Sequence, residues 1–374
     1  MKRNLLHIFS IIGMIFSLIS CGDDNNEPPK STTRTIAIYM IATNSLSSCD
    51  VDDLTEIEAS IQKNGMNNCR LLVYWVSKSE KPQLIEIKKE KKSIKRTVHK
   101  VYSDDIKSTT IERMQEVFTD IIATAPADDY GLILWSHASG WANSLTARSN
   151  ISTLDFGDDY GSTMPIDELA EAIPEGVFSF IYSDACYMSG VEVVYELRNK
   201  TKYFIGSTTE LPLDGMDYTN NIPCFFSGKL DLAQCCKNTF NKYNSLSGSA
   251  RTCTISLIDC SKLDQLAALC KTIHANGTSV TDVSSIQRYK RTSPYLFFDF
   301  VQYTEMLATD EQKTALRQLM NEVVPYKANT PYIFSSLAIN IHSGLSTYIL
   351  GTTQSSGVNE RYYKTLSWYK DVIQ

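Results

Sequence analysis

From residue 34 onward, short apolar runs alternate with longer amphipathic stretches. The apolar runs lie at Thr35–Ala42, Arg70–Ser77, Tyr130–Ser136, Val177–Ser183 and Lys202–Ser207. The amphipathic stretches lie at Asp50–Asn64, Ser108–Thr124 and Pro165–Ile173. Continuous apolar runs are typical of strands buried on both faces, and helices between them are typical crossovers of a parallel sheet. The pattern therefore predicts an α/β fold with a mostly parallel central sheet.

The pattern changes after a polar loop at residues 244–249. Strand-like segments follow at Thr252–Ile258, Ile333–Ile341 and Ser346–Leu350. Helix-like segments follow at Ser261–Ala275, Tyr295–Met306 and Asp310–Val324. One more helix-like segment, Tyr187–Arg198, lies before the loop. We expect residues 34–250 to form the main domain and residues 251–374 to form an α+β region packed on it.

The first 33 residues are interpreted as a targeting segment and a linker, not as part of the folded domain. Lys2 and Arg3 precede an apolar stretch, Leu5–Ile19, that is too short for a stable membrane span. The small residue before Cys21 resembles the bacterial lipobox, so residues 1–20 are predicted to be a lipoprotein signal peptide and Cys21 the lipidated residue. Residues 21–33 are polar and predict a flexible tether. We expect a lipid-anchored protein of the bacterial cell envelope, at the outer membrane and facing the periplasm or the surface; a plain secretory signal is the alternative.

Composition excludes some classes of function. The 374 residues hold 36 Lys+Arg against 42 Asp+Glu, for a net charge of −6, which argues against a nucleic-acid partner. The one dense basic run, Lys88–Arg96, is interpreted as a solvated loop or hairpin. Removing Cys21 from the ten cysteines leaves nine without a compact spacing, so we expect few or no disulfides.

Two apolar runs end in reactive side chains. Residues 131–136 lead into His137, and residues 177–183 lead into Asp184-Ala185-Cys186. Because ligands bind at the carboxyl ends of parallel strands, the imidazole and the thiol are expected to share one crevice. A thiolate is the nucleophile of a Cys–His pair, and a following helix at Tyr187–Arg198 would favour the anion. Amides of Ala138 and Cys186 are candidates for an oxyanion hole.

Each residue alone has a simpler interpretation. A cysteine that ends an apolar strand is more often a buried core residue, and a histidine after a strand is more often a hydrogen-bonding loop residue. Their joint occurrence, with small residues after each, favours catalysis.

Three ordered blocks resemble the clostripain-like cysteine peptidases (family C11, caspase-like clan CD). His137-Ala138-Ser139-Gly140-Trp141 is similar to their His-Gly-x-Gly-Trp block, and Asp184-Ala185-Cys186-Tyr187-Met188 to their Asp-Ala-Cys-x-Met block. Residues 207–218 are similar to a Pro-x-x-Gly-x-Asp-Tyr segment. The match spans about residues 34–260. It departs from the family at Ala138, where a glycine is usual, and at Thr208 and Thr209, where acidic residues are common.

The resemblance implies a caspase-like α/β/α sandwich and a monomeric endopeptidase that acts on peptide or protein substrates. It implies a His137–Cys186 dyad, Asp184 near the base of the S1 pocket, Thr208 in substrate binding, and cleavage after Arg or Lys. An Asp184 that caps the following helix is an equally weighted alternative. Arg148-Ser149 is a candidate self-cleavage site. No cofactor is expected, although calcium at Asp158-Asp159 is an alternative to a solvated turn.

Other classes of function are also open. The main alternative is a catalytically inactive surface lipoprotein that uses the caspase-like scaffold as a binding module. The sequence lacks the Gly-x-Ser-x-Gly elbow that is typical of serine hydrolases. It also lacks the His-Glu-x-x-His motif that is typical of metal-dependent hydrolases.

Overall fold

The computed structural model describes residues 33–142, 155–351 and 357–374. The signal peptide, the tether with Cys21, and the Arg148-Ser149 pair lie outside the described residues, so these stay predictions.

A nine-stranded sheet forms the centre of the fold, in the order β12-β10-β9-β8-β5-β1-β2-β3-β4. Its strands are β1 (Arg34–Ala42), β2 (Cys69–Ser77), β3 (Gln83–Glu90), β4 (Ser93–Val101), β5 (Tyr130–Trp135), β8 (Phe178–Asp184), β9 (Thr201–Gly206), β10 (Thr254–Asp259) and β12 (Tyr326–Asn329). The inner strands β2, β1, β5, β8 and β9 pair in parallel. The outer strands pair antiparallel, so the predicted parallel core is confirmed. The basic run at residues 88–96 belongs to the β3–β4 hairpin, as expected.

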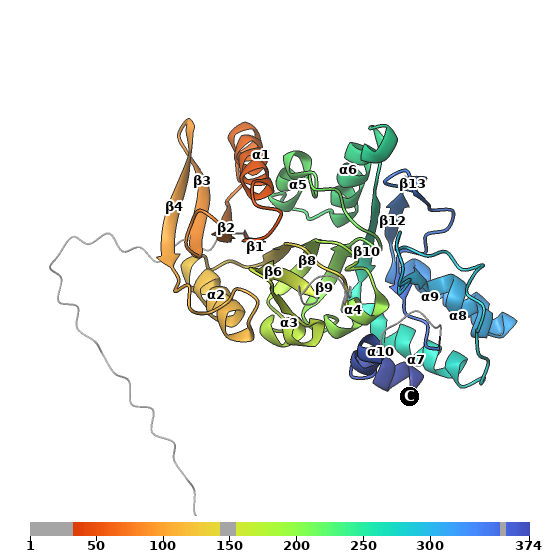
Figure 1. Ribbon diagram of the computed structural model, residues 1–374. Helices are drawn as coiled ribbons and strands as arrows, with labels where there is room; N and C mark the ends of the chain where they lie inside the picture. Colours follow the sequence, from red (N-terminus) through yellow and green to blue (C-terminus); the bar gives the residue numbers. More distant parts are fainter. Residues whose placement is uncertain (1–32, 143–154, 352–356) are drawn as a thin grey trace, which may run out of the picture. The chain divides into compact units, whose positions relative to one another are not determined.

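Helices cover both faces of the sheet (Figure 1). One face carries α1 (Cys49–Asn64), α5 (Tyr218–Phe225) and α6 (Leu232–Asn244); the other carries α2 (Ile111–Thr124), α3 (Ile166–Ala172) and α4 (Val191–Glu196). Alternate residues of β1 divide between the two cores: Ile36 and Ile38 belong to one, and Ala37 and Tyr39 to the other. Successive side chains of a strand point to opposite faces, so the wholly apolar β1 serves both layers. The α/β/α sandwich is confirmed.

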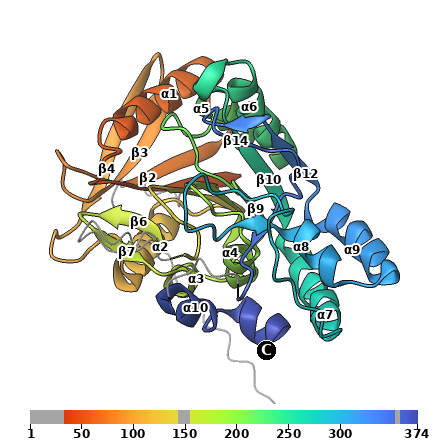
Figure 2. The ribbon, with the colours of Figure 1, turned by 45° about the vertical axis from the view of Figure 1, so that its right-hand side comes forward.

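Residues 251–374 extend this sheet as well as packing on it, because they supply β10 and β12. They also form α7 (Leu263–His274), α8 (Phe300–Leu307), α9 (Asp310–Val323), α10 (Gly357–Tyr363) and the short strands β11 (Phe298–Asp299), β13 (Tyr332–Ile333), β14 (Leu337–Ala338) and β15 (Ser346–Thr347). Figure 2 shows α7, α8 and α9 beyond the β10–β12 edge. The added α+β region is thus confirmed.

Smaller elements complete the described chain. They are the hairpin β6 (Phe156–Asp159) and β7 (Ser162–Met164), the 3₁₀ turns at Gly248–Ala250 and Cys260–Lys262, and a π-helical end at Tyr369–Ile373. The single strand predicted at residues 333–341 is instead the β13–β14 hairpin. Phe334 and Ser335 both adopt positive φ there, at 46° and 54°, which turns the chain back on itself.

One buried carboxyl joins the C-terminal region to α4. The Oε1 atom of Glu192 accepts the Tyr348 amide at 2.7 Å and the Thr347 hydroxyl at 3.0 Å. Glu192 is fully buried, and burial raises its pKa to about 7. Strand β15 is therefore fastened to the first turn of α4.

In the described ranges, no helix has the length and apolar character that a membrane span requires.

Candidate active site

The register of two neighbouring strands places the predicted dyad at one edge of the sheet. Strands β5 and β8 run in parallel, and Trp135 pairs with Asp184 at their carboxyl ends. His137 and Cys186 each follow this last pair by two residues. Both residues therefore follow the same carboxyl edge of the sheet, which is where parallel α/β sheets bind their ligands.

His137 is half-buried and is held by a neighbouring loop. Its Nε2 atom lies 2.8 Å from the Ser45 hydroxyl, and its carbonyl accepts the Gly157 amide at 2.9 Å. Ser45 follows the end of β1, the other neighbour of β5. Burial lowers the pKa of His137 below its ordinary value of 6.5, and the charge of Asp158 opposes this in part. The imidazole is consequently neutral at pH 7.

Cys186 is partly exposed, and its sulfur accepts the Leu211 amide at 3.3 Å. Burial raises the pKa of Cys186 to about 11, while the Leu211 amide acts in the opposite direction. The resting site therefore holds a neutral thiol. The predicted helix start is wrong: α4 begins at Val191 after the N-cap Gly190, so no helix end adjoins the thiol.

An ion pair that the sequence did not reveal lies beside the thiol. Arg291 binds Glu210 through two contacts, of 2.5 and 3.1 Å, and both charges act on Cys186. The ring of Tyr187 stacks on Phe297 with centroids 4.8 Å apart. The C-terminal region therefore contacts the loop that carries the nucleophile.

Asp184 is buried on the side of the sheet that α5 covers. Its Oδ2 atom accepts the Met216 amide and the Tyr218 hydroxyl, each at 3.1 Å. Burial raises its pKa to about 6. The helix-cap interpretation of Asp184 is wrong, because the next helix has Gly190 as its N-cap residue and no side-chain cap.

A second buried carboxyl, on α1, lies close to Asp184. Asp53 accepts the Trp135 indole N–H at 2.7 Å, and burial followed by the charge of Asp184 raises its pKa to about 8. Two such carboxyls favour a cation between or beside them. Asp53 also lines a cavity of about 290 Å³, which is bounded by Cys49, Asp52, Asp53, Glu56, Leu213, Asp214 and Lys242.

The remaining predicted residues have the following places. Thr208 is fully buried and donates its hydroxyl to Thr254 at 3.2 Å. This bond involves neither His137 nor Cys186. Ala138 is buried and bridges to Phe156. Asp158 accepts the Gly161 amide at 2.7 Å in the β6–β7 turn.

Asp159, the other half of the calcium alternative, is buried beside that turn. It accepts the Thr43 hydroxyl at 2.9 Å and the Ser108 amide at 2.8 Å. No group of three or more His, Cys, Asp or Glu side chains suited to a metal occurs within the described segments.

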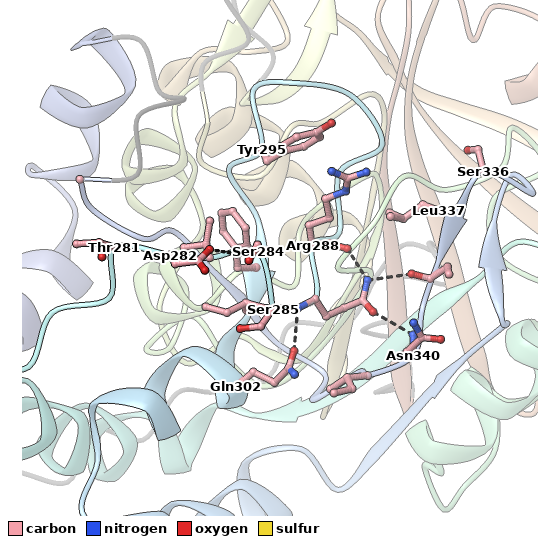
Figure 3. Close-up of a pocket in the computed structure, with 17 residues that line it drawn as sticks. Thr281, Asp282, Ser284, Ser285, Arg288, Tyr295, Gln302, Ser336, Leu337 and Asn340 are labelled. Carbon is pink, nitrogen blue, oxygen red and sulfur yellow. Dashed lines mark hydrogen bonds between the residues drawn. The ribbon is translucent and has the colours of Figure 1, made fainter.

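A larger cavity, of about 820 Å³, lies in the C-terminal region. Figure 3 shows Arg288, Tyr295 and Asn340 around it. The guanidinium of Arg288 lies 4.1 Å from the centre of the Tyr295 ring. Neither dyad residue lines this cavity.

An α/β/α sandwich in which an imidazole and a thiol follow two neighbouring parallel strands is the arrangement expected of a caspase-like hydrolase. Comparison with known proteins narrows this class. The model of the clostripain family, peptidase family C11, matches residues 38–373. The chain belongs to the clostripain family and is a cysteine peptidase. A search of curated proteins found no match.

Solved structures agree with this assignment. An inactive zymogen of a C11 protease from Parabacteroides distasonis is 34% identical with a TM-score of 0.81, covering 92% of this chain and 99% of that one. A secreted C11 cysteine protease from Bacteroides thetaiotaomicron, in complex with an irreversible peptide inhibitor, is 31% identical with a TM-score of 0.79 and coverages of 91% and 98%. A clostripain from the same species, in complex with the inhibitor BTN-VLTK-AOMK, is 31% identical with a TM-score of 0.51 and coverages of 58% and 97%.

Proposed function

We propose that this cysteine peptidase is an exported, lipid-anchored endopeptidase that cleaves after Arg or Lys, with Cys186 as nucleophile and His137 as general base. The observation that carries the proposal is the shared register, in which both residues follow the Trp135–Asp184 pair by the same two positions.

The proposed reaction starts from a neutral thiol and a neutral imidazole. When Nε2–H of His137 is donated to Ser45, Nδ1 is the basic nitrogen that takes the thiol proton. The Cys186 sulfur attacks the scissile carbonyl, and the amides of Ala138 and Cys186 stabilise the oxyanion. His137 then gives its proton to the leaving amine, and water releases the acid from the acyl-enzyme with His137 again as base.

Preference for a basic residue is supported by the acidic side chains around Asp184. Asp184 and Asp53 are buried and electrostatically coupled, and Asp52, Glu56 and Asp214 line the cavity that Asp53 borders. A substrate ammonium or guanidinium would pair with carboxylates that are otherwise costly to ionise. The similar clostripain binds an inhibitor whose peptide, VLTK, ends in lysine.

The anchor and the activation step are further parts of this proposal. Cys21 follows a signal-like segment, and a similar protein is described as secreted, which supports export. Another similar protein is described as an inactive zymogen, which supports activation by cleavage. Arg148-Ser149 is the site at which we propose this cleavage.

One experiment tests location and specificity together. The full-length protein and its Cys21→Ser and Cys186→Ala variants are expressed with the signal segment, and membrane and soluble fractions are assayed with fluorogenic peptides ending in Arg, Lys or a neutral residue. We expect activity on the basic peptides in the membrane fraction, its transfer to the soluble fraction in Cys21→Ser, and its loss in Cys186→Ala. Equal cleavage of neutral peptides would refute the specificity, and membrane retention of Cys21→Ser would refute the anchor.

A further inference from the structure

Two cysteine thiols meet where helices α5 and α6 pack together, away from the proposed dyad. Cys224 lies in the last turn of α5 and Cys235 in the first turns of α6. The Cys224 thiol donates to the Asn220 carbonyl at 3.4 Å and the Cys235 thiol donates to the Asp231 carbonyl at 3.5 Å, and the two thiols act on each other electrostatically. Asn238, one turn after Cys235 on the same helix, donates its Nδ2–H to the Cys224 sulfur at 3.5 Å. The sulfur of Cys224 therefore faces the Cys235 side of α6.

The two cysteines have different surroundings. Cys224 is partly exposed, and the neighbouring Cys235 thiol and the Asn238 amide lower its pKa to about 7 against the effect of burial. Cys235 is fully buried, and burial, followed by the neighbouring Cys224 sulfur, raises its pKa. A partly exposed low-pKa thiol next to a buried partner is the arrangement of an attacking and a resolving cysteine.

No other described thiol combines these features. Of the nine cysteines in the described part of the chain, only Cys224 has a lowered pKa. Cys49 is also partly exposed, but burial and the nearby carboxylates of Asp53 and Asp52 raise its pKa. Cys49 therefore serves as an internal reference for reactivity.

We propose that Cys224 and Cys235 form a dithiol site that reacts with small-molecule or protein disulfides and closes a disulfide between α5 and α6. In the first step the Cys224 thiolate attacks one sulfur of the oxidant, forms a mixed disulfide and releases one thiolate. In the second step Cys235 loses its proton to solvent and attacks the Cys224 sulfur, which releases the second thiolate. The protein dithiol loses two electrons, and the disulfide oxidant gains them.

A disulfide between Cys224 and Cys235 would connect two helices that contact the proposed specificity site around Asp184. Helix α5 begins at Tyr218, whose hydroxyl donates to Asp184, and α6 carries Tyr243, whose hydroxyl donates to the Gly215 carbonyl. A bond between Cys224 and Cys235 would fix these two helices to each other. Because a cross-link restricts the unfolded chain, the oxidised protein should unfold at a higher temperature than the reduced protein.

The test uses the full-length protein, with oxidised glutathione as the oxidant. The folded, reduced protein is exposed to a limiting amount of iodoacetamide at pH 7, or to oxidised glutathione, and each cysteine is then followed by peptide mapping. We expect Cys224 to alkylate on the order of tenfold faster than Cys49, because it is mostly the thiolate that reacts. We also expect a linked Cys224–Cys235 peptide in the oxidised sample, and a glutathione adduct that persists on Cys224 in Cys235→Ser.

Two outcomes would overturn the proposal. One is equal alkylation of Cys224 and Cys49 in the folded protein; the other is the absence of the linked peptide after oxidation. Both are read in the unmodified sequence, so the decision does not depend on the folding of Cys235→Ser. Neither readout uses peptidase activity, so failure here is distinguishable from failure of the proposed function.

Discussion

At the scale of single residues, the site rests in an uncharged form. Burial lowers the pKa of His137 and raises the pKa of Cys186 to about 11, so no thiolate–imidazolium pair is present before substrate binds. In the proposed mechanism, catalysis then depends on proton transfer from sulfur to imidazole, which requires the correct tautomer. Because burial lowers the pKa of His137, activity should fall on the acid side at a lower pH than an ordinary histidine, of pKa about 6.5, would give.

Ser45 is the residue that sets this tautomer in our account. Replacement by alanine removes one hydrogen bond of about 1 kcal/mol, so kcat should fall about fivefold with little change in KM. The measurement is the pH dependence of kcat and of kcat/KM on a lysine-ended fluorogenic peptide.

The matched control is Ser45→Thr, which keeps a hydroxyl at the same place. This variant should retain most of the activity that Ser45→Ala loses. If the two variants were equally active at every pH, the hydroxyl would have no part in positioning His137.

At the scale of elements, the parallel core was predictable and the long-range contacts were not. The runs at residues 35–42, 70–77 and 130–136 became β1, β2 and β5 within a residue or so, because a strand buried on both faces must be continuously apolar. The start of α4 was predicted too early, since residues 187–190 are held by backbone bonds to distant segments, including Tyr187 to Thr209. No local pattern encodes such partners.

Glu192 shows how one such contact couples distant elements. Its pKa is raised from 4.5 to about 7, so its contribution to stability is fully present below about pH 4.5 and is lost as the pH rises through 7. Between pH 5 and pH 8 this loss is on the order of 2 kcal/mol.

Glu192→Gln removes the titration while keeping the shape of the side chain. The variant should therefore gain on the order of 2 kcal/mol relative to the original protein when the pH is raised from 5 to 8. Urea unfolding of both proteins at the two pH values measures this difference. A difference between the two proteins that does not change with pH would show that Glu192 is ionised in the folded state at both values.

At the scale of the whole molecule, the C-terminal region belongs to the peptidase itself. It supplies β10 and β12 to the central sheet, Arg291 beside the thiol, and Phe297 against Tyr187. The sequence predicts the dyad because each member closely follows a recognisable strand. It did not indicate Ser45 or the Glu210–Arg291 pair, because these reach the site from loops whose positions depend on the complete fold.

The most direct measurement of the central claim is the site and rate of covalent labelling by a lysine-directed acyloxymethyl ketone. Mass spectrometry should find stoichiometric label on Cys186 and none on Cys224, and His137→Ala should slow the reaction by on the order of a hundredfold or more. Label on another cysteine, or an unchanged rate in His137→Ala, would contradict the assignment of Cys186 and His137 as nucleophile and base.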